Sequence, residues 1–148
     1  MTFKEKVEET LASHENNGAK KRIIADLHIK VGKCDDEACS WADFKYKKQE
    51  KYFNPYGSIH GGIACVIADT CMGTAIYAAT GIFPSTSDMS LSYLSPMAGD
   101  EFGIHVKILH IGSHLVSASC EISDQDDGKL CVCVMARFYL VRENILDE

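Results

Sequence analysis

The sequence predicts an α+β fold in which an antiparallel sheet surrounds one long, apolar helix. The first observation is a nearly uncharged run over residues 59–87 whose middle has the length of a long helix. The second is a series of segments with alternating apolar residues, which is typical of strands with one buried face. Because a helix that is apolar on most sides must be covered, we expect six strands curled around it.

The N-terminal segment predicts a second, amphipathic helix. Phe3, Val7 and Leu11 recur at helical spacing, so the helix is expected from Thr2 to about Asn16. An Asn-Asn-Gly sequence then ends it. The basic residues 20–22 are expected to form a solvated connection.

Strands and the central helix are expected in a fixed order after this connection. Alternating apolar residues predict a strand over residues 23–31, and a return strand over residues 38–46 completes a hairpin. The long helix is expected over residues 60–79, ending near Gly81. Short loops predict that the last four strands form an antiparallel meander over residues 85–94, 101–111, 114–123 and 130–141.

Length and composition favour one globular domain. The chain has 148 residues, of which 46% are hydrophobic and 24% charged. These values fit a single domain over residues 1–148, with residues 1–22 as an N-terminal helix and its connection. The net charge of −6 argues against a nucleic-acid partner, because binding to phosphate backbones needs a basic face.

We expect a cytoplasmic protein without a membrane span. The N-terminus is charged where a signal peptide would be apolar. Residues 59–83 have the length of a membrane helix, but Asp69 near their middle would be costly there. The seven cysteines are odd in number and lack a secretory context, which favours buried thiols over disulfides, zinc or redox chemistry.

A single carboxylate stands out in the central segment. Asp69 is the one charged side chain in residues 59–87. Burial of a carboxylate without partners is strongly disfavoured, so Asp69 requires either structural pairing or a role in chemistry. Both interpretations stay open on the residues alone.

The start of the central helix is the second candidate site. Gly61 and Gly62 leave backbone N–H groups open at the positive end of the helix, where they can hold negative charge developing on a carbonyl oxygen. The alternative is close packing of the glycines against the sheet. His60 fits a base, a ligand or a structural residue, and Asn54 fits a turn or a group that positions water or a carbonyl.

Helical geometry separates the two candidate sites within one chain. Asp69 lies nine positions after His60, which corresponds to a rise of ~13 Å and to opposite sides of a regular helix. The two groups can meet if two subunits place the helix start of one beside the Asp69 of the other. This predicts a dimer with intersubunit sites. The remaining histidines show neither a catalytic triad nor a metal-ligand pattern, so no metal is expected.

The spacing Asn54-x5-His60-Gly61-Gly62-x6-Asp69 resembles the signature of hotdog-fold thioesterases of the PaaI-like and acyl-CoA thioesterase 13 type. Residues 88–96 resemble the strand after that family's central helix, and residues 128–138 resemble its last strand. The resemblance covers roughly residues 53–140.

The resemblance implies a hotdog fold, pairing into a homodimer or a dimer of dimers, and hydrolysis of acyl-CoA thioesters without a cofactor. Asp69 is then the general base or nucleophile. The Gly61 N–H of the other subunit polarises the thioester carbonyl, and Asn54 orients the attacking water or the thioester. His60 shapes the helix start and is positioned to contact substrate.

Three further residues are implied on the substrate-binding side. Gly62 belongs to the helix start. Some relatives carry a hydroxyl near the catalytic carboxylate, and here Thr86 or Ser87 falls at that place; both stay candidates because the local loop length differs by about one residue.

Two other functions remain open. A hotdog hydratase or dehydratase would move protons next to a thioester, and the lack of a glutamate in the central helix favours hydrolysis over this chemistry. The other alternative is a non-catalytic regulator that binds acyl-CoA.

Overall fold

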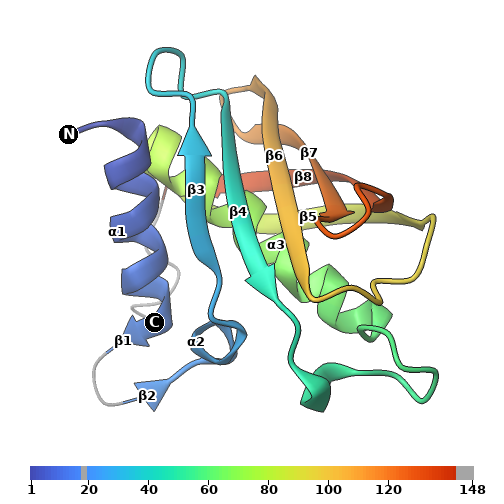
Figure 1. Cartoon of the computed structure of the whole chain (residues 1–148). Helices are drawn as coiled ribbons and strands as arrows, with labels where there is room; N and C mark the ends of the chain where they lie inside the picture. The colour runs from blue at the N-terminus through green and yellow to red at the C-terminus, as the bar shows by residue number, and fades with distance from the viewer. Residues whose placement is uncertain (18–19, 143–148) are drawn as a thin grey trace.

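The computed structural model describes residues 1–17 and 20–142, and in these residues a curved antiparallel sheet wraps around one long helix (Figure 1). The elements are α1 (Phe3–Glu15), β1 (Asn16–Asn17), β2 (Lys20–Lys21), α2 (Ile23–Leu27), β3 (Lys30–Cys34), β4 (Trp41–Lys47), η1 (Glu50–Tyr52), α3 (Gly61–Thr80), β5 (Phe83–Tyr93), β6 (Glu101–Ile111), β7 (Leu115–Asp124) and β8 (Leu130–Val141). The predicted α+β class, both main helices and the number of strands in the sheet are confirmed.

The apolar residues of α3 form the centre of the core. Ile67, Cys71, Met72 and Ile76 are fully buried and belong to one hydrophobic core that also includes residues of the sheet and of α1. Half of the apolar 18-residue window of α3 lies buried inside the fold, so its membrane-like length and hydropathy are those of a core helix. Helix α3 ends at Gly81, as predicted, and Gly81 adopts the left-handed conformation with φ of 70° that is common at helix C-termini.

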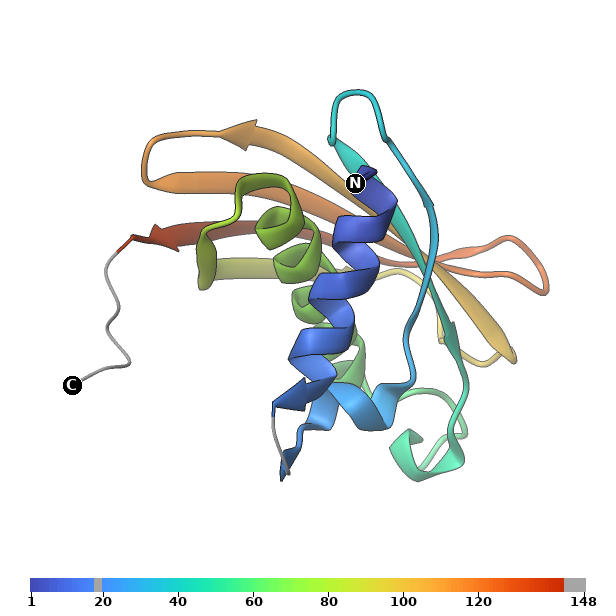
Figure 2. The ribbon, with the colours of Figure 1, turned by 90° about the vertical axis from the view of Figure 1, so that its left-hand side faces the viewer.

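The N-terminal helix covers part of α3 at one end of the sheet (Figure 2). Phe3, Val7 and Leu11 are buried, as their spacing predicts. A reciprocal pair of hydrogen bonds between Thr2 and Glu5 caps the first turn of α1. Helix α1 therefore packs against one part of α3 and leaves another face of α3 uncovered.

The predicted strand over residues 23–31 is wrong in its first half. Residues Ile23–Leu27 form the short helix α2, which is followed by His28 with φ of 52° and by β3 from Lys30. Over so few residues, apolar residues at every second position fit either conformation. Leu27 is fully buried while Ile23 is half exposed, so the alternating residues do not share one buried face as a strand would require.

The connection to α2 and the order of the strands also differ from expectation. Lys20–Lys21 form a short ladder with Asn16–Asn17 instead of a plain connection. The main sheet has the order β3-β4-β6-β7-β8-β5, so β6, β7 and β8 form a meander but β5 pairs with β8 rather than β6. Residues 94–100 are long enough to cross the intervening strands, which are spaced at about 4.8 Å.

Candidate active site

The start of α3 offers one backbone donor without a partner. His60 is the N-cap, and its ring Nδ1 accepts a hydrogen bond of 2.9 Å from the Gly62 N–H. Among residues 1–17 and 20–142, no group accepts a hydrogen bond from the Gly61 N–H. The Gly61 N–H thus points out of the helix at its positive end, where an anionic or polarised oxygen is favoured.

Tyr93 closes over this helix start from the end of β5. Its hydroxyl donates a hydrogen bond of 2.8 Å to the Gly61 carbonyl oxygen. A Cβ atom at Gly61 would lie 3.3 Å from two atoms of the Tyr93 ring, which is tighter than ordinary van der Waals contact. Glycine at this position therefore lets the ring lie directly against the helix start, and a larger residue would displace the ring by a few tenths of an ångström. The sequence predicted an important role for Gly61 but carried no sign that Tyr93 reaches it.

Asn54 holds the turn before α3 together. Its Oδ1 accepts hydrogen bonds from the backbone N–H groups of Tyr56 and Ser58, and its Nδ2 donates to the Ser58 hydroxyl at 2.9 Å. This is the turn chemistry that the sequence left open as one of two roles. Asn54, Ser58, Gly61 and Tyr93 line one hollow of about 480 Å³ beside the helix start.

Asp69 lies farther along α3 and is held by a hydroxyl. The Thr86 side chain donates a hydrogen bond of 2.6 Å to Asp69 Oδ1. Asp69 is half-buried, and within the described part of the chain its Oδ2 has no hydrogen-bond partner. Of the two hydroxyl residues left open by the sequence, the structure thus brings Thr86 to the carboxylate.

A β-bulge explains why Thr86 rather than Ser87 reaches Asp69. The register of β5 against β8 shifts between Thr86 and Asp88, so Ser87 is an extra residue without a direct partner. Thr86 is opposite buried Phe138 and therefore faces α3, while Asp88 is opposite Arg137 on the outer face. A one-residue insertion changes the face of every residue beyond it, which the apolar pattern of β5 does not reveal.

The predicted site residues fall into two groups that do not meet within one chain. Asn54, Gly61 and the neighbouring His60 and Gly62 gather at the helix start, whereas Asp69 pairs with Thr86. The helix is regular over Gly61–Thr80, so Asp69, eight positions after Gly61, lies about 12 Å from it along the helix axis. Ser87 belongs to neither group.

Cys65 lies on α3 one turn from each group, in surroundings that favour the neutral thiol over the thiolate. Burial, with a smaller effect of the Asp69 charge, raises the pKa of Cys65 above its ordinary value. The pKa of Tyr93 is also raised, first by burial and then by Cys65, so its phenol stays protonated and can donate a hydrogen bond.

All seven cysteines are free thiols. In residues 1–17 and 20–142, no three His, Cys, Asp or Glu side chains are arranged to hold a metal ion.

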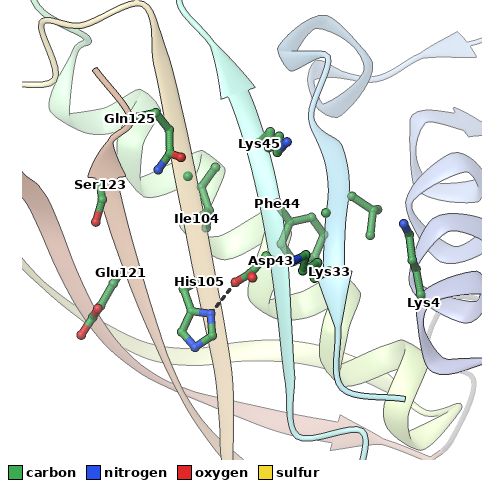
Figure 3. Close-up of a pocket in the computed structure, with 13 residues that line it drawn as sticks. Lys4, Lys33, Asp43, Phe44, Lys45, Ile104, His105, Glu121, Ser123 and Gln125 are labelled. Atoms are coloured by element: carbon green, nitrogen blue, oxygen red, sulfur yellow. Dashed lines mark hydrogen bonds and ion pairs between the residues drawn. The ribbon is translucent and has the colours of Figure 1, made fainter. Parts of the chain in front are cut away.

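A second hollow of about 530 Å³ lies on the outer face of the sheet (Figure 3). Its residues include Asp43 on β4, which is hydrogen-bonded to His105 on β6, together with lysines 4, 33 and 45. None of the predicted site residues lines it. Because the sheet separates this hollow from the open face of α3, its size does not connect it to the Asp69 or Gly61 chemistry.

Comparisons with known proteins agree with this architecture. A family model described as the thioesterase superfamily matches residues 56–131, from the turn before α3 to the start of β8. Acyl-coenzyme A thioesterase 13 of Mus musculus is 33% identical over 86 residues, which are 57% of this chain and 61% of that protein. This chain therefore spans about three fifths of the length of that relative.

Two solved structures share the fold over nearly the whole chain. Thioesterase superfamily member 2 of Mus musculus has a TM-score of 0.80 and 21% identity, covering 95% of this chain and 99% of that one. The E. coli PaaI protein from the phenylacetic acid degradation operon has a TM-score of 0.78 and 21% identity, covering 95% and 96%. At this identity the similarity shows a common fold, which is the hotdog arrangement that the sequence predicted.

The role of Asn54 in the turn predicts a loss of stability that needs no substrate to measure. Asn54→Ala removes three hydrogen bonds, two of them from backbone groups, and should lower the free energy of unfolding by about 1–3 kcal/mol. Asn54→Asp keeps the acceptor oxygen and should lose less. Urea denaturation of both variants measures the difference. Equal stability of Asn54→Ala and wild type would contradict this role.

Proposed function

The chain belongs to the thioesterase superfamily, since that family's model matches residues 56–131, and we propose that it hydrolyses an acyl-CoA thioester at a site shared by two subunits. The observation that carries this proposal is the pairing of Thr86 with Asp69 on a half-buried helix face. This arrangement presents a carboxylate oxygen beside apolar surface. The name of the mouse relative, an acyl-coenzyme A thioesterase, supports the choice of substrate.

The carboxylate has two routes to the products. Asp69 can attack the thioester carbon and form an anhydride that water then hydrolyses, or it can take a proton from water while the water oxygen attacks. In both routes the C–S bond breaks, its electron pair leaves on the CoA sulfur, and a proton is transferred to the resulting thiolate. The hydrogen bond from Thr86 fixes one carboxylate oxygen and leaves the other for the reaction.

The helix start supplies the complementary charge stabilisation. As the carbonyl carbon becomes tetrahedral, negative charge develops on its oxygen, and a preorganised N–H donor favours this state over the ground state. The unpaired Gly61 N–H of the described structure is such a donor. Asn54 lines the same hollow, and its second Nδ2 hydrogen is suited to hold the thioester or water.

A dimer would bring the two groups together. Within the described residues, β5 pairs with β8 along one side only, and its eleven residues leave the other side as a long open edge. Next to this edge, α3 exposes in part a row of residues at spacings of three and four: Gly62, Val66, Asp69 and Gly73. A second copy on this face would cover both features and place Gly61 of one subunit near Asp69 of the other.

The enzyme class is tested with a panel of acyl-CoA substrates of different chain length. Wild type should release free CoA thiol, and Asp69→Asn should lower kcat/KM by roughly 10²- to 10⁴-fold because the base or nucleophile is lost. Asp88→Asn is a matched control, since Asp88 pairs with Arg137 on the outer face. An enoyl-CoA in the panel detects hydration. Full activity of Asp69→Asn would refute the mechanism, and tight binding without turnover would favour a regulator.

Thr86 and Ser87 should respond differently to removal of their hydroxyls. Thr86→Val keeps the shape but removes the donor to Asp69, so kcat should fall about tenfold. Ser87→Ala changes an exposed residue of the bulge and should leave kcat within about twofold. Steady-state kinetics of the two variants on one substrate shows which of the two hydroxyls supports Asp69. A larger effect of Ser87→Ala than of Thr86→Val would contradict the observed register.

Sharing of the site between subunits is tested by complementation. Asp69→Asn lacks the carboxylate, and Gly61→Pro lacks the N–H. Proline suits the first helical position, and His60 already has the extended ψ of 133° that precedes proline. Each variant alone should be nearly inactive.

Heterodimers isolated through two different affinity tags should regain about half of wild-type activity, because one of their two sites combines an intact Asp69 with an intact Gly61. A site contained within one chain would give no recovery. Size-exclusion chromatography with light scattering confirms the dimers that the assay requires.

A further inference from the structure

We propose that Tyr93 is a positioning residue of this site, which holds the Gly61–Gly62 peptide so that the Gly61 N–H is aimed at the thioester oxygen. The proposal rests on the proposed thioesterase function. It gives β5 a second role, because the strand that holds Asp69 through Thr86 also holds the helix start through Tyr93. One strand thereby supports both halves of the site.

The register of β5 makes this double support possible. Met89, Leu91 and Tyr93 are opposite Ala136, Val134 and Val132, which are all buried on the inner face of the sheet. Thr86 is also opposite a buried residue, although it is separated from Tyr93 by an odd number of positions. The extra residue Ser87 shifts the register, so Thr86 and Tyr93 face the same side of the sheet. Without the bulge, Thr86 and Tyr93 would face opposite sides of the strand.

A chain of hydrogen bonds passes through the peptide unit that joins Gly61 to Gly62. The Tyr93 hydroxyl donates to its carbonyl oxygen at 2.8 Å, and its N–H donates to His60 Nδ1 at 2.9 Å. Both ends of the unit are thereby fixed, and hydrogen bonds in series strengthen one another. Rotation of this peptide would turn the adjoining His60–Gly61 peptide, which carries the proposed donor.

The same chain of hydrogen bonds fixes the state of the exposed His60 ring. Since Nδ1 accepts from the Gly62 N–H, the neutral imidazole carries its proton on Nε2. This places the N–H donor of the exposed ring on the nitrogen that does not cap the helix. His60 thus contributes as a cap with one nitrogen and offers a donor with the other.

Packing alone gives a weak reason for tyrosine at this position. Tyr93 is 57% exposed, so burial of its ring contributes much less than that of a core aromatic residue. The contact at the helix start accounts for both parts of the side chain, because the ring covers Gly61 and the hydroxyl bonds its carbonyl. A phenylalanine would preserve the first contact and lose the second.

Tyr93→Phe is therefore the deciding variant. It should lower kcat roughly three- to tenfold, with KM for the acyl-CoA changed less than about twofold, since the lost hydrogen bond acts on transition-state stabilisation. Tyr139→Phe on the outer face of β8 is the matched control and should leave both constants unchanged. Cooperative urea unfolding of both variants establishes that they are folded. An unchanged kcat in Tyr93→Phe would overturn the proposal.

A measurement without substrate keeps this proposal separate from the proposed function. In nitrogen–proton NMR spectra, Tyr93→Phe should shift the Gly62 amide resonance and change the His60 ring nitrogens, whereas Tyr139→Phe should not. If the wild-type protein hydrolysed no acyl-CoA, the thioesterase function would be overturned, yet a shift of the Gly62 resonance in Tyr93→Phe would still support the hydrogen-bond chain. Unchanged Gly62 and His60 signals would overturn the chain even in an active enzyme.

Discussion

The burial of α3 is the constraint on which the rest of this structure depends. A helix of twenty residues with one charged side chain cannot face water on all sides, and the inner face of a curved six-stranded sheet covers most of it. Phe44, Phe102 and Phe138 supply the large side chains on the sheet side of this contact. Helix α1 adds cover at one end. The sheet curves because its strands twist and because the helix it encloses is nearly cylindrical.

The part of α3 that this arrangement leaves open carries the carboxylate of the proposed active site. Asp69, the only carboxylate of the helix, lies on the half-buried side, where Thr86 satisfies one of its oxygens. Strand β5 borders the same opening and is an edge of the sheet. A second copy of the chain bound at this place would account for three features together. It would pair with the exposed edge of β5, cover the open apolar face of α3, and enclose the Asp69–Thr86 pair. The position of the open sheet edge beside Asp69 therefore supports the proposed intersubunit site.

Strand β5 shows how one local irregularity shapes a whole site. The bulge at Ser87 turns Thr86 toward Asp69 while Tyr93 still reaches Gly61. Both residues come from one rigid strand that pairs with β8 along its length. A site supported in this way is more precise than one placed on loops, because the hydrogen-bonded ladder limits the movement of each side chain.

The amino-acid sequence by itself determined the elements whose signals are local. The nearly uncharged run over residues 59–87, with glycines at positions 61, 62 and 81, predicts α3, and the same run isolates Asp69 as the carboxylate to explain. Tertiary structure decided the rest. The helical conformation of Ile23–Leu27, which buries Leu27 and leaves Ile23 half exposed, and the place of β5 beside β8 are both set by packing between segments far apart in the sequence. The choice of Thr86 over Ser87 and the reach of Tyr93 depend on strand register, since a single inserted residue reverses the facing of a strand without changing its composition.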